Sequence, residues 1–129
     1  MKYIIEVHEF SFNKIKNGSR KIAMHLFDKN TQKIDIGDIL DIHNSSNNEN
    51  IECLIKGIAI FDNFSDMTDA LTPEALGYKN KREVMIRVNR IFPKELLENL
   101  NAVAFFLEPK YEKIRQIERG ILERDNFER

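Results

Sequence analysis

Cysteine is nearly absent from this chain, and none of its apolar runs approaches the length needed to cross a bilayer. The single Cys53 excludes an internal disulfide and a zinc site built from several thiolates of one chain. The N-terminal segment is interrupted by charge and lacks the apolar core of a signal peptide. We therefore expect a cytoplasmic protein with no membrane partner.

The sequence also lacks an excess of positive or negative charge. Its net charge is −1 over 129 residues, so the molecule as a whole does not attract polyanions. The charges are nevertheless unevenly distributed. Residues 1–33 carry seven basic and three acidic groups, whereas residues 34–76 carry one basic and nine acidic groups. This pattern is compatible with a basic face that binds phosphate, and equally with charges that mix on folding.

Several well-known site motifs do not occur in the sequence. It has no phosphate-binding P-loop, no dinucleotide-binding fingerprint and no Gly-x-Ser-x-Gly elbow. Its three histidines, His8, His25 and His43, fall in separate predicted elements without the spacing of metal ligands. We therefore expect neither a metal ion nor a cofactor.

Strands are predicted where apolar residues alternate or run together, at 2–7, 21–27, 36–42, 51–61 and 102–107. A short polar loop separates the third from the fourth, which predicts an antiparallel hairpin. Alternation over 21–27 is typical of a half-buried strand. It places Ile22, Met24 and Leu26 on one face and Lys21, Ala23 and His25 on the other.

Capping residues indicate the helices. Ser11 is placed to begin a short helix, and Gly18 stands where a helix C-terminal glycine belongs. Ser65 and Asn80 are placed to begin two later helices. The later helices are expected over 66–71, 72–77, 81–89 and 93–100, and alternating valines and isoleucines leave a strand as the alternative for 84–92.

The C-terminal segment has a different pattern from the rest. Apolar residues recur there at spacings of three and four, which predicts a charged helix with a narrow apolar seam of Tyr111, Ile114, Ile117 and Ile121. We expect a main domain over residues 1–107 and this helix over residues 108–129. The helix either packs on the main domain or pairs with a partner, which would give a homodimer.

The order of the predicted elements resembles that of the ASCH domain family, which belongs to the PUA-like superfamily. The resemblance covers roughly residues 3–107 and rests on the stretches 12–25, 36–42 and 58–64, followed by 76–78 and 91–93. It implies an α+β fold, a PUA-like small β-barrel of about five to six mostly antiparallel strands. Short peripheral helices and a C-terminal helix would surround the barrel.

The family signature, Gly-x-Lys-x-x-Glu-x-Arg, aligns with residues 18–25 of this chain. Gly18 matches it, whereas Arg20, Ala23 and His25 stand at the Lys, Glu and Arg positions. The resemblance implies a cleft here that binds RNA or a modified nucleotide. It also implies, as an alternative, an amidohydrolase of acetylated cytidine-type nucleosides or a nuclease.

The residues themselves favour binding. Arginine offers a planar set of donors suited to phosphate, and Arg20 and Lys21 are expected to form a basic cluster with Lys14 and Lys16. We predict a nucleotide or a single-stranded RNA end as the ligand. Backbone donors at Gly18 and Ser19, an aromatic ring for stacking at Tyr78, and the polar side chains of His25, Asp38 and Asp62 complete the predicted ligand site.

Hydrolysis is the second hypothesis. A catalytic lysine must lose its proton at the working pH, which burial makes possible for lysine and which does not occur for arginine in proteins. Lys21 is therefore the candidate nucleophile or base, with His25 as acid or base and Glu74, Asp38 or Asp62 as the carboxylate. The favoured interpretation of Asp38 is that it stabilises its own turn through backbone amides. A protein-interaction module that uses the C-terminal helix is the third hypothesis.

Overall fold

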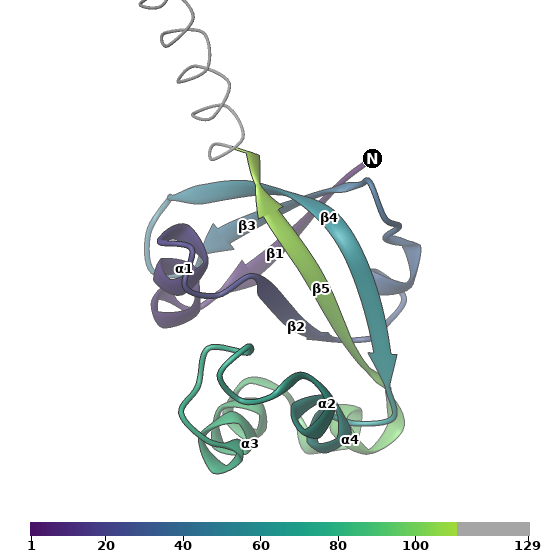
Figure 1. Cartoon of the computed structure of the whole chain (residues 1–129). Coiled ribbons are helices and arrows are strands. Elements are labelled where there is room, and N and C mark those ends of the chain that lie inside the picture. The colour runs from purple at the N-terminus through teal and green to yellow at the C-terminus, as the bar shows by residue number, and fades with distance from the viewer. Residues whose placement is uncertain (111–129) are drawn as a thin grey trace, which may run out of the picture.

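A single mixed β-sheet of five strands forms the centre of the protein (Figure 1). The computed structural model describes residues 1–110, so the prediction of a C-terminal helix and of its pairing lies almost wholly outside the described residues. The strands are β1 (Lys2–Val7), β2 (Ile22–Leu26), β3 (Ile39–Asn44), β4 (Asn50–Phe61) and β5 (Ala102–Pro109). Their order across the sheet is β1-β3-β4-β5-β2.

The sheet curls into a half-barrel. β1 pairs with β3 in parallel, and the other three pairings are antiparallel, including the predicted hairpin of β3 and β4. A register shift between Ile55 and Gly57 interrupts the pairing of β4 with β5, and such irregularities bend a strand. The α+β class and the mostly antiparallel, barrel-like sheet are thus confirmed.

Both faces of the strand pair β2–β5 are buried. Val103 and Phe105 pack into one core cluster, and Ala102 and Ala104 pack into a second one on the opposite face. The same holds for β2, where Ala23 belongs to the first cluster and is only 2% exposed. The strand itself is confirmed, and Lys21 at its predicted start is exposed, but Ala23 was expected on the solvent face and is instead buried in the first cluster with Phe12 and Ile15 of α1.

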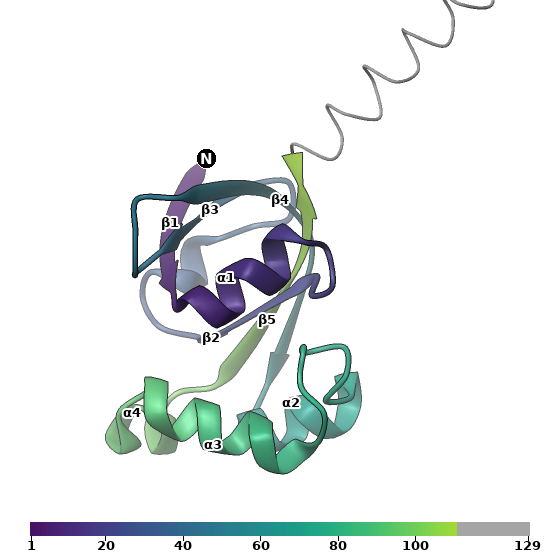
Figure 2. The same cartoon turned by 90° about the vertical axis from the view of Figure 1, so that its left-hand side faces the viewer.

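Two groups of helices cover the sheet (Figure 2). α1 (Glu9–Lys16) lies against the curled sheet and contributes buried side chains to the first core cluster. α2 (Phe64–Leu71), α3 (Lys81–Ile91) and α4 (Lys94–Asn99) form a layer at one end of the sheet and enclose the second cluster. A single turn of 3-10 helix, η1 (Thr31–Lys33), precedes β3. Within residues 1–110, no helix has both the length and the apolar character that crossing a bilayer requires.

The helix boundaries confirm some of the predicted caps and correct others. Asn80 accepts a hydrogen bond from the Glu83 backbone N–H at the start of α3, so the helix prediction is confirmed and the strand alternative for 84–92 was wrong. Asn63, and not Ser65, caps α2. α1 begins at Glu9, earlier than expected, and Ser11 lies within it. Ser11 is free to take another role because no cap bond occupies its hydroxyl.

Three further boundaries differ from expectation. Residues 72–77 form consecutive turns in place of a helix, closed by bonds from the Leu76 and Tyr78 backbone N–H groups to the Pro73 carbonyl. β3 starts at Ile39 because the preceding residues form a turn in which Asp38 N–H donates to the Asp35 carbonyl. β5 continues to Pro109, past the expected domain boundary at residue 107.

Candidate functional site

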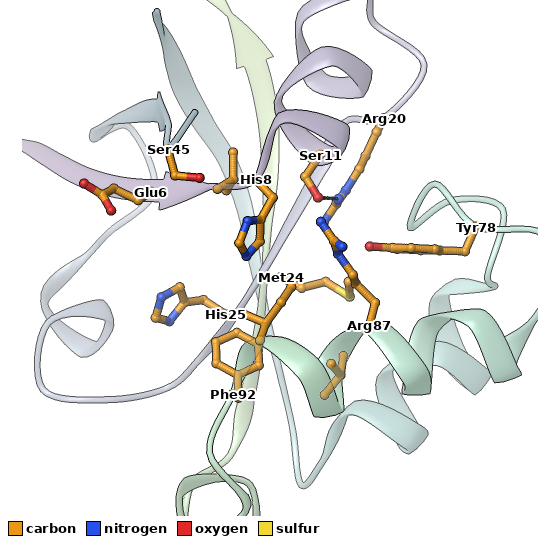
Figure 3. Close-up of a pocket in the computed structure, with 13 residues that line it drawn as sticks. Glu6, His8, Ser11, Arg20, Met24, His25, Ser45, Tyr78, Arg87 and Phe92 are labelled. Atoms are coloured by element: carbon orange, nitrogen blue, oxygen red, sulfur yellow. Dashed lines mark hydrogen bonds between the residues drawn. The ribbon is translucent and has the colours of Figure 1, made fainter. Parts of the chain in front are cut away.

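A cavity of about 200 Å³ lies where α1, β2 and α3 meet (Figure 3). Its walls come from segments far apart in the sequence: the end of β1, the first turn of α1, the middle of β2, the turn before α3 and the inner side of α3. The lining residues are Glu6, Val7, His8, Ser11, Arg20, Met24, His25, Ser45, Tyr78, Arg87, Val88, Ile91 and Phe92.

Arg20 is buried at the wall of this cavity, with 5% of its surface exposed. Gly18, at φ +83°, ends α1 and turns the chain so that the Arg20 backbone N–H donates to the Lys14 carbonyl. The side chain is then fixed by two bonds, from Nε to the Ile22 carbonyl (2.7 Å) and from Nη1 to Ser11 Oγ (3.0 Å). Since a guanidinium carries five N–H donors, some remain for a ligand.

Burial lowers the pKa of the Arg20 guanidinium, because removing the charge from water disfavours the protonated form. Tyr78 opposes this shift in pKa and the nearby charge of Arg87 adds to it. Arginine stays protonated at neutral pH in spite of such shifts. Two positive charges therefore share one small cavity.

Arg87 is the second cation of the cavity and extends from the middle of α3 (Figure 3). Its Nε is buried and has no hydrogen-bond partner. Among the ion pairs of residues 1–110, none includes Arg87 or Arg20. Glu6 also lines the cavity, but its side chain lies outside ion-pair distance of both arginines.

Tyr78 faces the two arginines from the turn that precedes α3. Figure 3 shows its hydroxyl pointing toward the guanidinium groups, and this buried oxygen has no hydrogen bond within normal geometry. The turn needs glycine at position 77, where φ is +91°. A Cβ there would also lie 3.0 Å from Arg20 Cδ, so backbone and arginine are in close contact.

His25 closes another side of the cavity. Its Nδ1 lies 3.0 Å from the Leu26 carbonyl oxygen, and its ring packs edge-on against Phe92 at 5.5 Å between centroids. A carbonyl only accepts hydrogen bonds, so this contact assigns the proton of the neutral ring to Nδ1. Nε2 is then the atom able to accept a hydrogen bond from a ligand.

The structure brings together three of the predicted site residues, Arg20, His25 and Tyr78. Ser19 is exposed, and its backbone N–H is bound by Asn17 Oδ1. Lys21 is exposed at the edge of β2, where its carbonyl accepts from the Leu107 backbone N–H. Gly18, Ser19 and Lys21 do not line the cavity.

The predicted carboxylates also lie elsewhere. Asp38 accepts bonds from the Met1 amino group (3.1 Å) and from the Asp35 backbone N–H (2.8 Å), which confirms its role in its own turn. Asp62 and Glu74 are exposed and do not line the cavity. The structure therefore does not assemble the expected group of Lys21, His25 and a carboxylate from these candidates.

The predicted basic cluster is assembled only in part. Lys16 pairs with Glu49 at 2.7 Å, on the side of α1 that faces the β3–β4 loop. Lys14 instead donates to the Gly77 carbonyl, and Arg20 is buried. Lys14 and Arg20 nevertheless lie together, since each cation is 5.8 Å from the Tyr78 ring centroid. Lys16 and Lys21 lie apart from them, so the predicted cluster is confirmed only in part.

The other ten lining residues were absent from the predicted site, among them His8, Ser11, Arg87 and Phe92. Arg87 had a signal in the sequence. It stands three residues after Val84 and four before Ile91, which places a charge on the side of α3 that carries apolar residues. Ser11 had none, since a serine near a helix start is first interpreted as a cap.

Metal ligation finds no support in the described part of the chain, where no three His, Cys, Asp or Glu side chains gather closely enough to hold an ion. The chemistry available in the cavity comes from its own side chains. Two guanidinium groups, three hydroxyls and two histidines line it and can bind an oxyanion, while Met24 and Phe92 offer apolar contact beside it.

Comparison with known proteins supports the fold. No family model matches the chain, and no curated protein matches it. The crystal structure of the hypothetical protein PH0355 is similar with a TM-score of 0.75 and 25% identity, over 84% of this chain and 99% of that one. The solution NMR structure of protein PF0455 from Pyrococcus furiosus is similar with a TM-score of 0.64 and 21% identity, over 84% and 97%.

These similarities define the class of the protein as a small α+β fold with a curled, five-stranded half-barrel. Neither neighbour's name states an activity, so the functional argument rests on the cavity.

Proposed function

We propose that this protein is an ASCH-like domain that binds a nucleotide, modified or not, or an RNA end through a phosphate group held in the cavity. The observation that carries the proposal is the pair Arg20 and Arg87. Both line one cavity, neither belongs to an ion pair within residues 1–110, and the Arg87 Nε is buried without a partner.

Two cations in one cavity repel each other, and burial adds a desolvation penalty. An internal carboxylate would offset both effects in a purely structural arrangement. A bound phosphate does the same, because it carries up to two negative charges and accepts several charge-assisted hydrogen bonds. Tyr78 and Ser11 add hydroxyls within the same walls.

The size of the cavity restricts the ligand. A volume of about 200 Å³ is below the usual range of several hundred Å³ for sites that enclose a whole cofactor. It accommodates a phosphate and part of the attached nucleoside, so the rest of a larger ligand must lie outside. Met24 and Phe92 would contact the sugar or base, and His25 Nε2 is placed to accept a hydrogen bond.

The hydrolase alternative has less support. Its expected lysine, Lys21, and its expected carboxylate, Glu74, are both exposed and outside the cavity. Of the three candidate catalytic residues only His25 lines the walls. Binding requires only the cations and hydroxyls that are already grouped there.

Calorimetric titration at low salt tests the proposal with a nucleoside 5′-monophosphate and the matching nucleoside. We expect the monophosphate to bind and the nucleoside to bind at least about tenfold more weakly. Arg87→Ala should weaken monophosphate binding about tenfold or more, because it removes a charge-assisted contact. The matched control is Arg90→Ala, since Arg90 is an exposed arginine on the same helix that does not line the cavity.

Equal affinity for the nucleoside and its monophosphate would contradict the proposal. So would an Arg87→Ala protein that binds the monophosphate as the wild type does.

A further inference from the structure

An exposed aromatic ring lies beside the cavity and outside its walls. Phe10, on the first turn of α1, is 49% exposed, although a phenylalanine is usually buried. Its ring centroid is 6.1 Å from that of Tyr78, which does line the cavity. The ring is therefore held next to residues that line the cavity, with about half of the side chain open to solvent.

Two cations flank the same ring. The Lys14 Nζ is 4.5 Å from the Phe10 centroid, and the Arg87 Cζ is 5.8 Å from it. Lys14 is held in place by its bond to the Gly77 carbonyl. Neither cation forms an ion pair with a carboxylate within residues 1–110.

Arg87 joins the two features, because one guanidinium both lines the cavity and lies against Phe10. An aromatic ring next to cations without carboxylate partners is the chemistry that recognises single-stranded nucleic acid. Bases stack on the ring, and the phosphates between them meet the positive charge. A flat apolar protein partner would gain nothing from these two half-buried cations.

We propose that Phe10, with Lys14 and Arg87, forms a second nucleotide position next to the cavity, so that the ligand is a single-stranded oligonucleotide with at least one nucleotide beyond the phosphate in the cavity. This inference rests on the proposed function, because the cavity supplies the first position. It narrows the class of ligand from a nucleotide or an RNA end to a single-stranded chain of nucleotides.

The test compares a nucleoside 5′-monophosphate with a 5′-phosphorylated single-stranded RNA hexamer, both measured by calorimetry at the same low salt. The wild type should bind the hexamer about tenfold more tightly, which is the usual effect of stacking one base. Phe10→Ala should reduce the ratio of the hexamer affinity to the monophosphate affinity to near one. Phe10→Tyr keeps the ring and should keep the ratio.

Leu96→Ala is the matched control, since Leu96 is an apolar side chain on α4, 43% exposed and outside the cavity. It should leave both affinities unchanged. All of these substitutions are at exposed positions, so folding should survive them.

A hexamer that binds no more tightly than the monophosphate would overturn the inference and leave the proposed function in place. A Phe10→Ala protein with an unchanged ratio of the two affinities would overturn it as well. So would self-association of the wild type in light scattering that is lost in Phe10→Ala and in none of the other variants. Failure of both ligands to bind would instead reject the proposed function itself.

Discussion

At the scale of single residues, Arg20 is the most unusual feature of the molecule. Its guanidinium is 5% exposed, and burial lowers its pKa, so the fold does not fully compensate the charge. Its bonds to Ser11 and to the Ile22 carbonyl orient the group without neutralising it. A buried charge that is oriented but not paired is better explained by a ligand than by stability.

The unpaired charge of Arg20 leads to a prediction in which ligand binding and folding stability respond differently. Arg20→Met keeps the apolar stem and removes the charge. Because apolar replacements of buried charges are often neutral or stabilising, we expect a change in the free energy of unfolding of no more than about 1 kcal/mol in the destabilising direction. Monophosphate binding should fall below detection.

Urea denaturation and calorimetry on the same preparation check both halves of this prediction. An Arg20→Met protein that loses several kcal/mol of stability would show that the guanidinium is mainly structural, and retained binding would remove Arg20 from the site.

At the scale of elements, α3 positions the cavity. It carries Arg87 on the side that packs against the second core cluster, and Tyr78 immediately precedes its cap. Asn80 accepts from the Glu83 backbone N–H, while Glu83 Oε2 accepts from the Lys79 backbone N–H. These reciprocal bonds fix the start of the helix and the turn before it.

The caps of α2 and α3 offer a matched pair of variants. Asn80→Ala and Asn63→Ala each remove a side chain that caps a helix N-terminus, so each should lower the free energy of unfolding by about 1 kcal/mol. Only Asn80→Ala should also weaken monophosphate binding, by about two- to threefold, because of these two helices only α3 carries residues that line the cavity.

Denaturation and calorimetry on both variants measure the difference. Equal loss of affinity in the two would mean that general destabilisation, and not the placement of α3, governs binding.

At the scale of the whole molecule, the sequence predicted the elements better than the site. β1 and β4 were located closely because their apolar residues run with few interruptions, and Asn80 marked α3 correctly. The burial of Ala23 on a second covered face could not be foreseen, since it depends on which helices pack on which side of the sheet.

The cavity was predicted in part, for the same reason. Arg20 and His25 were found through the segment that resembles the ASCH signature. Arg87 is distant in sequence and meets them only through the packing of α3 against β2. The expected partners of His25 were chosen by their nearness in sequence or by loop position, and the fold places Lys21 and Glu74 elsewhere.

The measurement that tests the central claim most directly is an NMR titration that observes the arginine Nε–H groups. The protein is titrated with a nucleoside 5′-monophosphate and, in parallel, with the matching nucleoside. Because the Arg87 Nε has no partner, its signal should move most, and that of Arg20 should move with it, under the monophosphate alone. Unchanged Arg20 and Arg87 signals, or shifts confined to exposed arginines such as Arg82 and Arg90, would contradict a phosphate site in this cavity.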